Sequence, residues 1–173
     1  MSKTIQVRLD PKSIEAAIKE IQKYRDEVET KAKLLVERLA KMGAEIARIK
    51  IVEMGAYYSG ELYAGVDGYF DYATNTGYVK VASDHAAFVE FGTGIKGYID
   101  PHKNGEYLSK ASWDYGSGKT IFNTADGRVG WYFPLGDGTW RFTEGMPSRP
   151  FMYETSLLLQ REYQRIAKEV FGK

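Results

Sequence analysis

The sequence predicts an α+β fold: a long N-terminal amphipathic helix, an antiparallel sheet built of hairpins, and a C-terminal helix. Apolar residues recur at helical spacing in the first third of the chain, alternate in its middle, and return to helical spacing after residue 150. With 173 residues, 43% of them hydrophobic, the chain is long enough for one core and too short for two. We therefore expect one domain, residues 1–173.

The N-terminal helix has a clear start signal. Ile5, Val7 and Leu9 alternate with polar residues, which predicts a short half-buried strand. Asp10 and Pro11 then provide an N-cap and a proline for the first helical position. We expect helix from about Pro11 to Met54, either continuous or jointed near residues 24–26, with a length of ~65 Å if it is straight.

An apolar stripe with alternating steps of three and four residues runs along this helix. We call it the apolar stripe, and its members are Ile14, Ile18, Ile21, Val28, Ala32, Leu35, Leu39, Met42, Ile46 and Ile49. Arg25 is the one charged residue in the line. The stripe is longer than a small sheet covers, so it fits either a jointed helix folded on its own core or a helix whose far end packs on a second copy. We place that far end at Met42, Ile46 and Ile49.

Two hairpins are predicted after the helix. The segment after Gly55 has the pattern of a strand, which turns at residues 74–77 and returns at 78–81. One or two helical turns follow from Ser83 to Phe91 and stop at Gly92. The second hairpin, 129–143, is expected to set Trp131 and Phe133 against Trp140 and Phe142. The C-terminal helix opens at residues 146–151.

Between the hairpins, residues 95–128 are rich in glycine and poor in aliphatic side chains, which indicates an extended loop or arm. The segment nevertheless holds several aromatic rings, which suit a contact with another protein. The rings are Tyr98, Tyr107, Trp113, Tyr115 and Phe122. We expect the arm to lie on a neighbouring subunit, with a loop folded on its own domain as the alternative.

Composition excludes several functional classes. The absence of cysteine removes disulfides, thiolate catalysis and cysteine-based zinc sites. No apolar run approaches the ~18 residues of a membrane span, and the polar N-terminus does not resemble a signal peptide. The net charge of +1 gives no case for a dedicated nucleic-acid binder. We therefore expect a soluble protein that folds in a reducing cytoplasm, without a cofactor or metal.

Two glycine-rich segments support an alternative function, a nucleotide-binding or enzymatic α+β domain. Residues 92–97, GTGIKG, match the letters of the dinucleotide fingerprint, but no helix is expected after them and no parallel βαβ unit surrounds them. Residues 116–120, GSGKT, resemble the end of a phosphate-binding loop, but Trp113 stands where its first glycine belongs. His85 and His102 are interpreted as solvated or near a helix cap, and Asp67 and Asp71 as a solvated strand face.

Three short segments in a fixed order resemble the tail-completion, or neck, proteins of long-tailed bacteriophages. After the long helix come Ser59-Gly60-Glu61-Leu62, then Ala87-Phe88-Val89-Glu90-Phe91-Gly92-Thr93, then Arg149-Pro150-Phe151-Met152. Members of that family carry a T-G-x-L segment, a Y-A-x-x-V-E-x-G-T segment and a Q-P-F-type helix start. The resemblance spans about residues 28–171. The proline usual before T-G is absent, and the stretch between Thr93 and Arg149 is long, so the resemblance does not interpret residues 95–145.

The resemblance implies a structural virion protein with no catalytic activity. It implies a ring of about six copies in the neck or tail, with a head-completion adaptor on one side and a tail terminator or tail tube protein on the other. DNA would pass through the channel without specific binding, and assembly would take place in the cytoplasm of the bacterial host.

Glu90 is the one carboxylate inside the apolar run HAAFVEFGTG, residues 85–94. Arg149 stands at the start of the helix that must return against this run. We therefore predict that Glu90 pairs with Arg149 of the same or an adjacent subunit, with an exposed glutamate as the alternative. These two residues, the helix positions 42, 46 and 49, and the rings at 98, 107, 113 and 115 are the candidate assembly residues.

Overall fold

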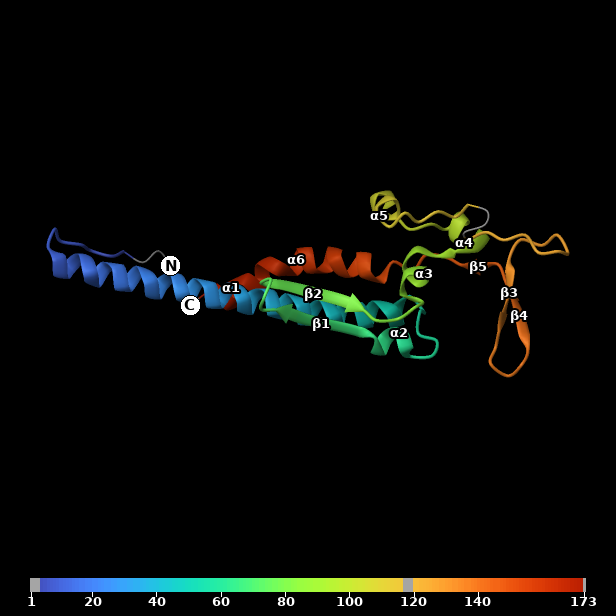
Figure 1. Cartoon of the computed structure of the whole chain (residues 1–173), viewed down its shortest axis with the longest axis horizontal. Coiled ribbons are helices and arrows are strands. Elements are labelled where there is room, and N and C mark those ends of the chain that lie inside the picture. Colours follow the sequence, from blue (N-terminus) through green and yellow to red (C-terminus); the bar gives the residue numbers. More distant parts are fainter. Residues whose placement is uncertain (1–3, 117–119, 173) are drawn as a thin grey trace.

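The computed structural model describes residues 4–116 and 120–172 and has the expected α+β architecture (Figure 1). The helices are α1 (Pro11–Glu53), α2 (Glu61–Ala64), α3 (Ala86–Phe91), α4 (Gly94–Ile99), α5 (Gly105–Lys110) and α6 (Phe151–Phe171). The strands are β1 (Val66–Asp71), β2 (Thr76–Val81), β3 (Trp131–Pro134), β4 (Trp140–Thr143) and β5 (Gly145–Met146). The antiparallel pairs β1–β2 and β3–β4 form two separate two-stranded sheets.

Helix α1 is one continuous helix of 43 residues, so the jointed alternative is wrong. Its start is as predicted: the Asp10 carboxylate accepts a hydrogen bond from the Ser13 N–H at 2.9 Å, and Pro11 occupies the first turn. The helix ends at Glu53 with Met54 as its C-cap, and Gly55 follows with φ +64°. A left-handed residue at this point stops the helix and lets the chain leave it.

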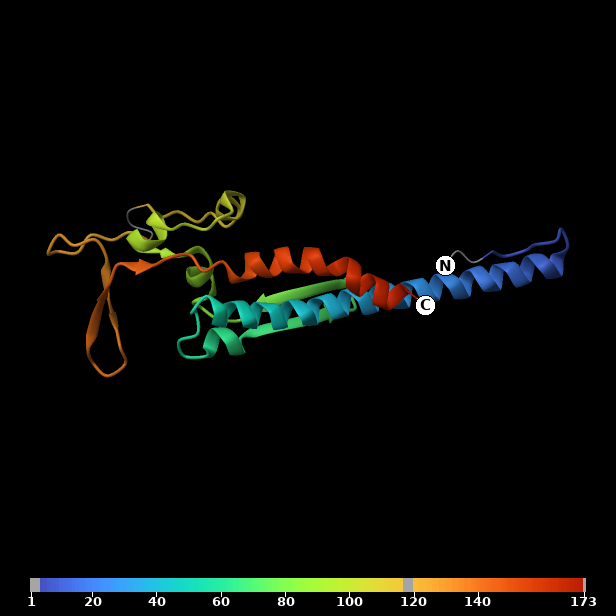
Figure 2. The same cartoon turned by 180° about the vertical axis from the view of Figure 1, so that it is seen from behind.

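The body of the molecule consists of the second half of α1, the hairpin β1–β2 and α6, which lie alongside one another (Figure 1). Helix α6 runs antiparallel to α1, and α3, α4 and the hairpin β3–β4 gather beyond its N-terminal end (Figure 2). One buried cluster joins these parts. Its members are Ala44, Ala47, Ile51, Ala56, Leu62, Val66, Val89 and Phe151.

Small residues let the hairpin and α6 approach α1 closely. A Cβ built on Gly43 would lie 2.6 Å from a methyl of Val79 in β2 and 2.9 Å from a methyl of Leu159 in α6. A Cβ on Gly68 in β1 would lie 2.2 Å from the backbone oxygen of Ala40. The core face of α1 is therefore the row of small residues Ala40, Gly43, Ala44 and Ala47, followed by Ile51.

The apolar stripe is not the core face of α1, contrary to the interpretation that its own fold covers it. None of its members is fully buried. The buried small-residue face lies about a third of a turn away from the stripe around the helix axis. Met42 and Ile46 are half-buried beside the body, and Ile49 is 54% exposed. Helical spacing identifies residues on one face, but it does not say which face the fold uses.

The end of α1 that lacks cover is the N-terminal one, not the end near Met42, Ile46 and Ile49 where we expected it. Residues 11–30, which we call the rod, project beyond the body, and every residue from 18 to 30 is exposed (Figure 1). Ile14, Ile18 and Ile21 are 43%, 48% and 56% exposed. The first part of the apolar stripe, which lies on the rod, is thus exposed to solvent.

One predicted strand is absent, and another begins later than predicted. Residues 4–8 form no strand, and Val7 and Leu9 are exposed, because no other strand lies beside this segment in the described chain. The strand after Gly55 is replaced at first by the short helix α2 and begins only at Val66. Gly60, with φ +83°, lets the chain turn into α2.

Residues 95–128 are less extended than predicted, because α4 and α5 lie within them. The second hairpin forms as expected, but with another pairing: Trp131 lies opposite Thr143, and Tyr132 lies opposite Phe142. Since directly opposed residues share a face of the sheet, Trp131 and Phe142 point to opposite faces. The expected packing of Trp131 and Phe133 on Trp140 and Phe142 is therefore wrong.

The close packing of β1 on α1 can be tested with Gly68→Ala. We expect this added methyl to lower the free energy of unfolding by ~1–3 kcal/mol, because the backbone of α1 cannot yield as a side chain could. Gly105→Ala is the matched control, since its Cβ would meet nothing within 4 Å. Urea denaturation followed by circular dichroism measures both, and equal midpoints for the two variants would contradict this packing.

Candidate functional site

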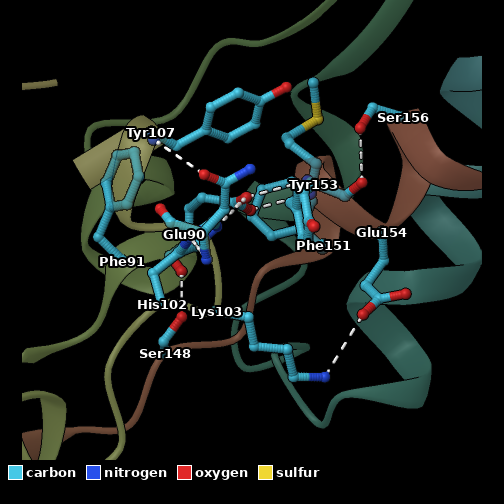
Figure 3. A network of polar contacts seen from close by, with 12 residues as sticks. Glu90, Phe91, His102, Lys103, Tyr107, Ser148, Phe151, Tyr153, Glu154 and Ser156 are labelled. Carbon is cyan, nitrogen blue, oxygen red and sulfur yellow. Dashed lines mark hydrogen bonds and ion pairs between the residues drawn. The ribbon is translucent and has the colours of Figure 1, made fainter. Parts of the chain in front are cut away.

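Glu90 caps a helix that begins 61 residues later in the chain. It lies in α3, is 7% exposed, and points at the start of α6 (Figure 3). Its Oε2 accepts a hydrogen bond from the N–H of Met152 at 2.9 Å, and its Oε1 accepts one from Tyr153 at 3.0 Å. Pro150, the N-cap residue of α6, has no side-chain cap of its own. Glu90 therefore satisfies N–H groups that a helix start leaves without partners.

His102 is the third partner of this carboxylate. It is 3% exposed, and its Nε2 lies 3.3 Å from Oε1 of Glu90. Its Nδ1 accepts a hydrogen bond from the Asn104 N–H at 3.0 Å. The same Nδ1 also lies 3.2 Å from the Asn104 carbonyl oxygen, so this side of the ring does not fix the tautomer. We assign a proton to Nε2 because it faces a carboxylate oxygen of Glu90 that accepts a hydrogen bond from Tyr153 as well. We call Glu90, His102 and the two amides of α6 the Glu90 clamp.

The clamp is suited to holding structure. Burial raises the pKa of Glu90, while the bonds from Met152, Tyr153 and His102 act in the opposite direction. Both carboxylate oxygens are engaged by donors of the same chain. A carboxylate that acts as an acid or base needs an oxygen that can contact a substrate proton. Here backbone N–H groups and the histidine occupy both oxygens.

Backbone contacts fix the other side of the same turn. The Ser148 hydroxyl donates to the Glu90 carbonyl at 2.6 Å, and the Arg149 N–H donates to the Val89 carbonyl at 2.8 Å. Thr93 pairs antiparallel with Met146. These hydrogen bonds and the pairing of Thr93 with Met146 hold the segment that leads into α6 against the turn that follows α3.

The predicted pairing of Glu90 with Arg149 is wrong within the chain. Arg149 reaches this region through its backbone N–H, and its guanidinium takes part in no ion pair with any described residue. The positive partner we sought is replaced by His102, which we had interpreted as solvated or near a helix cap; it is buried. Asp100-Pro101 turns the chain after α4 and brings His102 back, and that turn is the one local signal that could have suggested it.

Most rings of the 95–128 segment pack on their own chain, which is the alternative we had left open. Tyr107 contacts Tyr153 edge-on at 5.6 Å, and Trp113 lies 5.1 Å from Phe91, both measured between ring centroids. The Tyr115 hydroxyl donates to the Phe91 carbonyl. Tyr98 differs, because it is 62% exposed. Tyr107, Trp113 and Tyr115 thus cover the Glu90 clamp. Tyr98 is the most exposed of the four candidate rings.

The glycines of residues 92–97 are explained by close packing within the chain. A Cβ on Gly92 would lie 2.7 Å from the Ser148 nitrogen, and one on Gly94 would lie 2.4 Å from the Glu144 oxygen. The helix α4 does begin inside this segment, contrary to our expectation, but it has six residues. The second glycine-rich segment, 116–120, falls largely on residues 117–119, outside the described part of the chain.

An apolar pocket of about 480 Å³ lies between α3 and the second hairpin. Its walls include Phe88, Phe122, Trp131, Phe133 and Met146. His85 and three threonines provide the few polar groups. Among the described residues its lining contains no carboxylate, lysine or arginine, so this part of the pocket fits an apolar side chain better than a phosphate or a metal.

Within residues 4–116 and 120–172, no group of three or more histidine or acidic side chains is placed to hold a metal ion. The helices in the same residues are too polar or too short to cross a membrane.

No family model matches the chain, and neither a curated protein nor a solved structure is significantly similar to it.

Replacing Glu90 by Gln tests the clamp. The amide NH₂ would face the Met152 N–H, so two buried hydrogen-bond donors would oppose each other. We therefore expect the free energy of unfolding to fall by ~2–4 kcal/mol. Glu154→Gln is the control, because its ion pair with Lys103 at 3.4 Å is exposed on the lysine side and should be worth no more than ~1 kcal/mol. If both variants unfold at the same urea concentration, Glu90 does not hold α6.

The identity of the Glu90 partner can be tested with double-mutant cycles. Glu90→Gln combined with His102→Asn should show a coupling energy of ~0.5–3 kcal/mol, because the two side chains are in direct contact. Glu90→Gln combined with Arg149→Gln should be additive within ~0.5 kcal/mol. The reverse result, coupling to Arg149 alone, would restore the ion pair that the structure replaces.

Proposed function

We propose that this protein is a structural component of the neck of a long-tailed bacteriophage, a tail-completion protein without catalytic activity. The support comes from the three sequence segments that resemble that family. Leu62 of the first, Val89 of the second and Phe151 of the third all belong to the one buried cluster of the body. Segments up to about 90 residues apart thus meet where Glu90 caps α6. This convergence carries the proposal.

The proposed assembly is a ring of about six copies. The rod and the exposed part of the apolar stripe support self-association, because a long uncovered apolar face is uncommon on a monomer. Charge also favours contact between copies: residues 1–50 hold 12 basic and 8 acidic side chains, and residues 51–120 hold 5 and 9.

The proposed neighbours are a head-completion adaptor on one side and a tail terminator or tail tube protein on the other. The pocket beside the second hairpin suits an apolar side chain of such a partner. DNA would pass through the ring without specific binding, in line with the net charge of +1. The protein would then reside in the virion after assembly in the host cytoplasm.

Deletion of the gene from its phage genome tests this function. We expect the mutant to yield DNA-filled heads and separate tails, and we expect purified protein added to the lysate to join them. Glu90→Gln protein should join them poorly, because its α6 is loosened, and Glu154→Gln protein should join them normally. Electron microscopy and plaque counts measure the outcome. Joined, infectious particles from the deletion mutant would contradict the proposed function.

The alternative, a nucleotide-binding or enzymatic domain using residues 92–97 or 116–120, is tested separately by thermal shift. A nucleotide at a hundredfold excess over its dissociation constant would stabilise the fold by ~2.7 kcal/mol. We expect no such stabilisation with nucleotides and magnesium, because the glycines of residues 92–97 pack on the chain itself.

A further inference from the structure

We propose that the apolar stripe of α1 is a docking surface for the α1 helix of a second copy of this chain, with its main contact on the rod. This refines the self-association in the proposed function and rests on it for the choice of a second copy as the occupant. It assigns the contact to residues 14–28, away from Met42, Ile46 and Ile49 where the sequence had placed it.

Except at Ala17, which is 7% exposed, the rod lacks the packing that ordinarily stabilises a helix in a protein. Its residues 18–30 are all exposed, and no element of the body reaches it (Figures 1 and 2). The rod continues a helix that the body nucleates, but most helical stability in proteins comes from burying an apolar face rather than from intrinsic propensity. A partner on the rod would supply that burial.

The spacing of the stripe is that of a coiled coil. From Ile14 to Ile49 the line advances by four, three, four and three residues without a break, with Arg25 as its one charged member. The mean spacing of 3.5 residues is the heptad repeat by which helices pack on one another. A helix packed only on its own small domain needs no such strict repeat, and here the body uses a different face, that of Ala40, Gly43 and Ala44.

The extent of the stripe suits a stable contact between copies. From Ile14 to Ile49 it is ~53 Å long. The stripe itself comprises ten apolar side chains and Arg25 per copy, about half of the ~20 residues that one partner contributes to a standard interface, so positions on either side of it would also take part. Arg25 in the line is the kind of polar position that fixes register in a coiled coil.

The charges of the rod favour a second copy over a membrane. The rod contains four basic and five acidic side chains, so its net charge is close to zero and two rods repel each other little. A helix that lies on an anionic membrane carries an excess of lysine and arginine on its polar face, and this rod does not. The surface therefore fits a helix of its own kind.

The test uses the purified full chain in sedimentation equilibrium over micromolar concentrations. We expect wild type to self-associate. The double variant Ile18→Glu and Ile21→Glu should raise the dissociation constant at least about tenfold, because it places charge in the apolar contact. The control is Ala16→Glu with Thr30→Glu, which adds the same charge on the outward side of the same rod and should associate like wild type.

Urea midpoints followed by the near-ultraviolet signal of the body should be equal for both variants, because all four positions are exposed. A monomeric wild type, or an Ile18/Ile21 variant that associates as tightly as wild type, overturns the inference. Either result leaves the neck function to be decided by the deletion experiment. Conversely, self-association through the stripe would stand even if the deletion mutant made joined particles.

Discussion

The whole arrangement depends on one buried carboxylate at the start of α6. Glu90 is 7% exposed and holds the amides of Met152 and Tyr153. Without it, the N-terminal end of α6 would leave buried donors unsatisfied, at a cost of ~1–3 kcal/mol each. Because α6 covers the small-residue face of α1, the position of α6 also sets how closely the hairpin β1–β2 packs. The clamp thereby joins the body to the elements gathered beyond it.

The parts of the molecule on either side of the clamp have different roles. On one side, small residues on α1 bring the hairpin and α6 into close contact, and the small-residue face of α1 is therefore buried within the subunit. The apolar stripe, about a third of a turn away, remains uncovered on the rod and half-covered on the body. At the opposite end, aromatic side chains line a pocket beside the second hairpin. A long helix with two such faces stabilises its own subunit and still offers a surface to another.

Local signals in the sequence predicted the local features. The Asp10-Pro11 start of α1, the hairpin β1–β2 and the α6 helix are all found, although the turn of that hairpin lies at residues 72–75 and not at 74–77. The features that depend on distant residues were missed. His102 reaches Glu90 only through the turn after α4, and Arg149 was chosen for its place in the sequence, whereas its backbone makes the contact. The register of the second hairpin and the face of α1 used by the core depend on packing that periodicity alone does not encode.

Native-state hydrogen exchange tests the central role of Glu90 most directly. If the clamp holds α6, the amides of Met152 and Tyr153 should exchange only when the whole protein unfolds, with the free energy of global unfolding. First-turn amides of a helix without a cap exchange by local fraying instead. Protection of these two amides equal to that of the core around Ile51 and Phe151 is the result the account predicts. Rapid exchange at Met152 and Tyr153 in an otherwise protected α6 would contradict it.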